Sequence, residues 1–144
     1  MEDLAGSDPE LAKDIMGIME SGNALDERGD KDAARSAYQR AWDLLPEPKL
    51  EWPPLSAWIT DSFFNLHFDN ADFAAAKQWA QKSLHARESE IDTGPLIALG
   101  MAHFELEDYA QARACFDQAY RHGKARAFQE RPRKYLAFYL DKNA

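Results

Sequence analysis

An internal repeat constrains the fold of this chain more than any other feature. Three segments of the 144-residue sequence align without gaps: GDKDAARSAYQRAWDLLPEP (29–48), NADFAAAKQWAQKSLHARES (70–89) and LEDYAQARACFDQAYRHGKA (106–125). Ala34, Ala76 and Ala112 occupy one register, and the separations between them are 42 and 36 residues. A period in this range predicts supersecondary units that stack on one another.

A second helical pattern precedes each segment, with apolar residues at three- and four-residue steps. Gly22 and Gly100 hold matched positions in the first and third of these patterns. A glycine inside a helix costs about 1 kcal/mol relative to alanine, so its use at both positions predicts a close approach of two helices. Phe64 stands at this position in the second unit, which is therefore expected to pack differently.

These small residues, the turn Gly29-Asp30 and the closing Pro46 resemble the tetratricopeptide repeat, over about residues 10 to 122. The resemblance implies an all-α fold in which three helix–turn–helix repeats stack as a short right-handed solenoid, followed by a C-terminal capping helix. The expected boundaries within one domain (1–144) are repeat one 9–46, a proline/Trp loop 46–54, repeat two 55–88, repeat three 92–123 and the capping helix 124–140.

The proline/Trp loop lies in the stretch LPEPKLEWPPLSAW (45–58), whose four prolines exclude a continuous helix. It adds about eight residues to the 34-residue period, and inserted residues project from one edge of a solenoid. Trp52 has two interpretations. It either folds back and fills the space between repeats one and two, or it forms one wall of a binding surface.

Charge is distributed unevenly along the chain. The net charge is -8, and residues 1–110 carry -13 whereas residues 111–144 carry +5. An acidic body repels nucleic acid and favours a basic protein partner, although the acidity alone can serve solubility. The basic stretch 121–134 is therefore expected to cap the stack, with cations that complement helix C-termini or the acidic body, and not to bind nucleic acid.

Location is predicted from three absences in the sequence. No apolar segment follows the acidic first residues, no apolar run is long enough to cross a bilayer, and the single Cys115 cannot form an internal disulfide. A cytoplasmic protein without membrane contact is the expectation.

Motifs for catalysis or metal binding are not found in the sequence, which predicts no enzyme, no metal and no cofactor. His67 and His103 lie 36 residues apart in equivalent registers and are expected to be structural. Cys115 is expected to be a packing residue, since no basic side chain at helical spacing lowers its pKa.

The tetratricopeptide resemblance implies an inner, concave surface formed by the first helix of each repeat. Asparagine amides there can donate to and accept from a peptide backbone, methionines adapt to apolar contacts, aromatic residues anchor interfaces and aspartates supply a negative field. With Trp52 of the loop, the expected partner-binding residues are Met16, Met19, Asn23, Asp26, Trp52, Trp58, Asp61, Asn65, Phe68, Ile97, Met101 and Phe104.

A narrower resemblance is carried by LLPEPKLEWPPLSAW, TGPLIALGMAHFELED (93–108) and FQERPRKYLAFYL (128–140). These segments resemble small bacterial tetratricopeptide proteins that are often encoded near secreted polymorphic toxins. The resemblance implies an immunity protein, and the acidic concave face is expected to block a basic toxin. Three repeats and a cap are expected to be stable alone, as a monomer or weak dimer. The alternative is a general adaptor that binds peptide segments of several partners.

Overall fold

The computed structural model describes residues 3–87, 89 and 91–141. Over these residues all regular elements are helices, and no strand is formed. The order is α1 (Leu4–Ser7), α2 (Pro9–Glu27), α3 (Lys31–Leu44), the 3₁₀ helix η1 (Lys49–Glu51), α4 (Leu55–Asp69), α5 (Phe73–Ala86), α6 (Gly94–Glu105), α7 (Tyr109–Gly123), the 3₁₀ helix η2 (Lys124–Phe128) and α8 (Arg133–Leu140).

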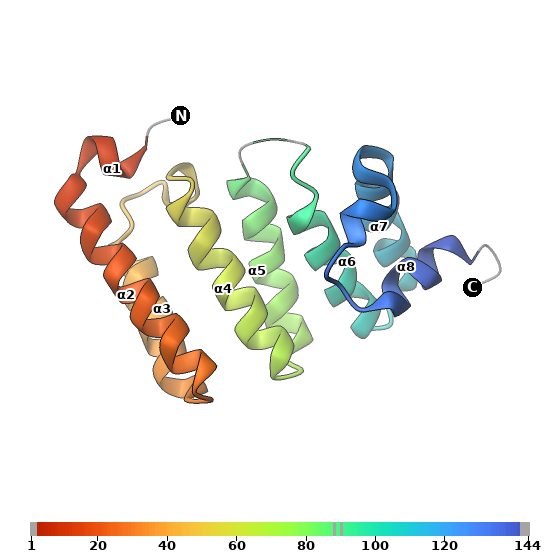
Figure 1. The fold of residues 1–144 in the computed structure, drawn as a ribbon, viewed down its shortest axis with the longest axis horizontal. Helices are drawn as coiled ribbons and strands as arrows, with labels where there is room; N and C mark the ends of the chain where they lie inside the picture. Colours follow the sequence, from red (N-terminus) through yellow and green to blue (C-terminus); the bar gives the residue numbers. More distant parts are fainter. Residues whose placement is uncertain (1–2, 88, 90, 142–144) are drawn as a thin grey trace.

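Three helical hairpins follow one another along the long axis of the molecule (Figure 1). They are α2–α3, α4–α5 and α6–α7, and the two helices of each hairpin pack along each other. Consecutive hairpins also touch, with α3 against α4, α5 against α6, and the first helices in the order α2, α4, α6. The predicted all-α repeat solenoid is confirmed.

One turn design joins the two helices of every hairpin. Its aspartate caps the second helix, accepting a hydrogen bond from the backbone N–H three residues ahead. The residue before each aspartate has a left-handed backbone, with φ of 84° at Gly29, 59° at Ala71 and 64° at Glu107. The first hairpin alone has glycine there, where the conformation costs least. The three capping residues are Asp30, Asp72 and Asp108.

Gly22 and Gly100 do mark close helix contacts. A Cβ added to Gly22 would stand 2.7 Å from Cε1 of Tyr38, and one added to Gly100 would stand 2.5 Å from Cε1 of Phe116. Both distances are too short for real atoms, so a large ring on the second helix requires a glycine on the first. This explains why the helix-destabilising residue occurs at both positions.

The second hairpin reverses this arrangement. Phe64 occupies the glycine position and is 3% exposed, while Ala80 occupies the ring position and is fully buried in the same core cluster. The large and small residues have exchanged helices, so the space between α4 and α5 is filled from the opposite side. The second repeat packs differently, as its phenylalanine predicted, and still forms a hairpin.

Trp52 folds back onto the first core, where it packs half-buried against the apolar residues of α2, α3 and α4. Its indole Nε1 donates to the carbonyl of Pro46 at 2.9 Å. Lys49 fixes the same loop, because its Nζ donates at 2.8 Å to the carbonyls of Trp42 and Leu45 at the end of α3. The contacts favour the packing interpretation of Trp52 over the binding wall.

The sequence predicts a capping element over 124–140 that is broken at Pro132, and the structure divides this range into η2 and α8. η2 continues from α7, and α8 begins only after Glu130, which has a left-handed backbone (φ 66°), and Pro132. Phe128 and Tyr135 are 5% and 1% exposed, and both rings contact Phe116 of the third hairpin. The cap therefore closes the last hydrophobic core and does not simply cover its end.

Candidate protein-interaction surface

Three of the twelve predicted partner-binding residues are buried, and their prediction as surface residues was wrong. Met19 and Ile97 are fully buried and Met101 is 4% exposed. Met19 belongs to the core formed by the first hairpin and α4. Ile97 and Met101 belong to the last core, which the C-terminal segment completes. The predicted partner-binding positions Ile97 and Met101 of α6 are thus covered by the chain itself.

Phe104 lies under the same segment. Its ring makes edge-on contacts with Tyr135 and Phe138 of the cap, with centroids 5.3 and 5.1 Å away. The ammonium group of Lys134 stands over the Phe104 ring at 5.5 Å. Phe68 is half-buried between the last two cores, against Phe64. Both aromatic residues act mainly in packing.

Two acids on the first helices, Asp26 of the predicted surface and Glu105 of α6, are paired with cations of the chain. Asp26 forms an ion pair with Lys31, and a side-chain hydrogen bond to Asp26 raises the lysine pKa. Glu105 on α6 pairs with Lys134 of the cap at 2.8 Å. The predicted negative field is therefore partly neutralised. The second pair confirms that a cation of the basic C-terminal stretch complements the acidic body.

Asn23 also has an internal partner, since its side-chain oxygen accepts a hydrogen bond of 2.7 Å from the Tyr38 hydroxyl. The bond joins α2 to α3 through the same Tyr38 ring that lies against Gly22, the preceding residue. Asn65, in the same register on α4, is exposed. The two asparagines are therefore not equivalent, and Asn65 is the one that presents its amide to solvent.

Asp61 on α4 is the exposed acid among the twelve predicted partner-binding residues. Its pKa is raised, mainly by desolvation and further by the charge of Asp92, whereas Ser83 and Arg131 act in the opposite direction. Arg131 shows the reverse effect, with a pKa lowered by burial and supported by Asp61. The chain between η2 and α8 thus brings a cation toward the central acid of the predicted face.

Three residues of the prediction are exposed, and together with Trp58, which packs half-buried against the first core, they lie on the neighbouring helices α2 and α4. Met16 is 42% exposed, Asp61 and Asn65 are exposed one turn apart on α4, and Trp58 is half-buried. We call these four residues the α2–α4 face. A methionine, an indole, an amide and a carboxylate together suit a protein surface better than a small-molecule site.

The histidines fulfil the structural role expected of them. His67 Nδ1 lies 3.4 Å from the capping Asp72, and His103 Nδ1 lies 3.4 Å from Asp108, so each ring packs at the end of one helix close to the residue that caps the next. Burial lowers the His103 pKa. Over the described part of the chain, no group of three His, Cys, Asp or Glu side chains is arranged to hold a metal.

Cys115 also fits its prediction as a packing residue. It is half-buried against the core cluster between the second and third hairpins. Burial raises the pKa of its thiol to about 11, which leaves the thiol protonated and unreactive at neutral pH.

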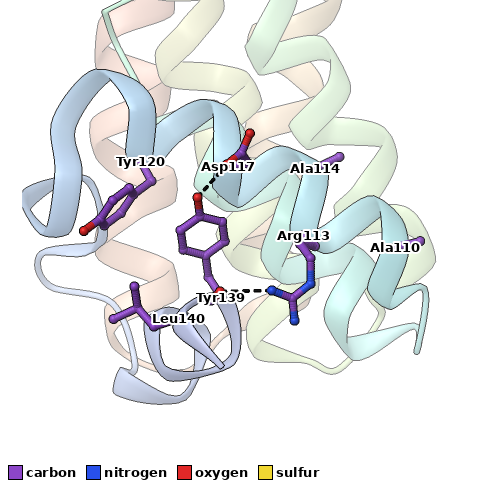
Figure 2. A pocket seen from close by; sticks show the side chains of 7 residues that line it. All are labelled: Ala110, Arg113, Ala114, Asp117, Tyr120, Tyr139 and Leu140. Carbon is purple, nitrogen blue, oxygen red and sulfur yellow. Dashed lines mark hydrogen bonds between the residues drawn. The ribbon is translucent and has the colours of Figure 1, made fainter. Parts of the chain in front are cut away.

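A hollow of about 720 Å³ lies between α7 and α8 (Figure 2). Arg113 projects from α7 and donates to the carbonyl of Tyr139 at 2.9 Å, while the Tyr139 hydroxyl donates to Asp117 (Figure 2). These bonds attach the last turn of α8 to α7. The hollow is lined by Ala110, Arg113, Ala114, Asp117, Tyr120, Tyr139 and Leu140.

Within the described residues, none of the helices combines the length and the apolar character that a bilayer span requires. A comparison with curated proteins found no match. A comparison with family models matched residues 95–125, which comprise α6, its turn and α7, to the tetratricopeptide repeat. This all-α helical repeat solenoid therefore carries, in its third hairpin, a sequence that matches the tetratricopeptide repeat family.

Proposed function

We propose that the chain is a non-enzymatic protein-interaction module that docks a basic protein on the α2–α4 face. The tetratricopeptide match supports the general role of protein binding. The observation that carries the specific surface is the exposed pair Asp61 and Asn65 on α4, with the half-buried Trp58 on the same helix and the exposed Met16 on the neighbouring α2. The net charge of -8 adds long-range attraction for a basic partner.

The partner we propose is a secreted toxin, which the chain neutralises in the cytoplasm as an immunity protein. Blocking requires only that the bound module occlude the toxin's active site or substrate path. The support is the resemblance of the LPEPK-x-EW stretch and of the third-repeat and C-terminal segments to proteins encoded beside toxins, together with the acidic character of residues 1–110. A general adaptor is the alternative.

Affinity capture from the source organism, at moderate salt with mass spectrometric identification, tests the proposal. The wild-type chain is compared with Asp61→Lys and with Asp43→Lys, a matched charge reversal at an exposed position on α3. We expect one stoichiometric basic protein that is lost with Asp61→Lys and retained with Asp43→Lys.

Growth assays then separate the two functions. An immunity protein predicts that the captured partner arrests growth when it is expressed alone, and that co-expression of the wild-type chain restores growth. Asp61→Lys should fail to restore it. Several weak partners without toxicity would support the adaptor. Equal capture by both charge-reversal variants would contradict docking on the α2–α4 face.

A further inference from the structure

The segment between η2 and α8 runs over the side of α6 that carries the predicted partner-binding residue Met101. η2 packs against α6, and the two residues that flank the segment, Phe128 and Tyr135, are anchored in the last core. Glu130 takes a left-handed backbone conformation (φ 66°) immediately before Arg131. For a residue other than glycine this conformation has an energetic cost, and here it redirects the chain between its two anchors.

Arg131 is the residue that this redirected segment places on the face. Its Nη1 lies 3.6 Å from the sulfur of Met101 on α6, and its charge acts on Asp61 of α4. The guanidinium thus lies against one predicted partner position, Met101 on α6, and its charge lowers the pKa of a second, Asp61 on α4. It is half-buried there.

The interactions that Arg131 and Asp61 make within the chain do not fully offset the desolvation of the two charged groups. Over the described residues, Arg131 has no direct ion pair, and the polar contact of its guanidinium is with a thioether, which is a weak acceptor. Burial lowers the pKa of the half-buried Arg131, and the pKa of Asp61, whose side chain still reaches solvent, is raised by partial desolvation. A direct, bidentate carboxylate–guanidinium pair supplied by another molecule would stabilise Asp61 more, and Arg131 would regain its hydration.

We propose that Arg131 is an internal ligand of this surface: it occupies the position that an arginine of the protein partner takes beside Asp61 and Met101, and the partner displaces it. The inference rests on the proposed function and adds the chemistry of the docking segment. A planar, weakly hydrated guanidinium suits a carboxylate beside a polarisable sulfur better than the compact ammonium of lysine does. The partner is therefore distinguished by an arginine at the contact.

A peptide probe tests the displacement on the full chain. The blocked peptide QERPR, copied from residues 129–133, is titrated into wild type and Arg131→Ala, with Arg133→Ala as the matched control. We expect Kd to fall about tenfold in Arg131→Ala, because the site is then free in every molecule. Arg133→Ala should bind like wild type. The double variant Arg131→Ala with Asp61→Asn should lose the gain, and the peptide with lysine in place of both arginines should not show it.

The methyl resonances of the methionines report where the peptide binds. In Arg131→Ala the Met101 signal should shift on titration, while the signal of the fully buried Met19 should stay unchanged. Arg131→Gln is the second variant if thermal melting shows that the alanine variant is unfolded. Equal affinity in wild type and in the Arg131 variants, or binding that leaves the Met101 signal unmoved, overturns the inference.

The outcome is separable from that of the proposed function. If capture of a basic protein depends on Asp61 while the peptide binds all variants equally, the internal-ligand inference is wrong and the docking face stands. If Arg131→Ala gains the peptide and no protein is captured, the inference stands and the proposed function fails.

Discussion

Gly100 on α6 lies against the ring of Phe116 on α7 so closely that a Cβ on the glycine would stand 2.5 Å from the ring. The same relationship recurs between Gly22 and Tyr38 in the first hairpin. In each of these two hairpins, the close contact between the helices therefore requires that the glycine position carry no Cβ.

Gly100→Ala is expected to lower the free energy of unfolding by about 1–2 kcal/mol. Overpacking of this kind costs about 1–3 kcal/mol, and the better helix propensity of alanine returns up to about 1 kcal/mol. Gly17→Ala is the matched control, because a Cβ at Gly17 meets nothing within 4 Å. This variant should be more stable than wild type, since alanine has the higher helix propensity. Urea unfolding measures both variants. Equal gains in the two would show that α6 and α7 are free to separate.

The exchanged pair in the second hairpin predicts strong coupling in a double-mutant cycle. Ala80→Phe alone should overpack the core at a cost of about 1–3 kcal/mol, and Phe64→Gly alone should leave a cavity at a cost of about 3–5 kcal/mol. The double variant recreates the arrangement of the first and third hairpins. It should be at least about 1 kcal/mol more stable than the sum of the single changes allows. Additive losses would mean that the two positions do not share one space.

The left-handed residues of the three turns give opposite predictions for opposite substitutions. Gly29→Ala should destabilise the chain by about 1 kcal/mol, since the L side chain then adopts an unfavourable backbone conformation. Ala71→Gly relieves the unfavourable backbone conformation of the matched turn and should raise the free energy of unfolding. The gain is reduced because glycine has a larger conformational entropy in the unfolded chain. Thermal melting should therefore rank Gly29→Ala below wild type and Ala71→Gly at or above it. The reverse order would contradict the shared turn design.

The thiol of Cys115 should respond to pH as a buried group. Its pKa of about 11 lies above the ordinary value of 9.0, so the reactive thiolate is rare at neutral pH and increases as the pH approaches 11. Alkylation by iodoacetamide should be far slower in the folded chain than in urea at pH 8, and the folded rate should rise steeply above pH 9. The neutral thiol favours the folded state, so stability from this residue is present below pH 9 and is lost as the pH rises through 11. Equal alkylation rates at pH 8 would place the thiol at the surface.

Much of this fold could be predicted from sequence because its determinants are local. The alanine register, the capping aspartates and the two mid-helix glycines each act within one hairpin, so their meaning does not depend on distant segments. The division of the cap at Pro132 was visible for the same reason. The accessible part of the predicted surface was less predictable, because a register position states which side of a helix a residue faces but not which other segment covers it.

The sequence by itself determined that three helical hairpins form and where each one turns, since helix periodicity, capping and the steric demands of glycine operate over a few residues. Only the tertiary structure decided which groove residues stay accessible. Ile97, Met101 and Phe104 lost their exposure to the returning C-terminal segment, and Arg131 came to lie against Met101, 30 residues earlier in the sequence. Contacts between such distant segments depend on how the hairpins stack, and they cannot be predicted from the repeat pattern.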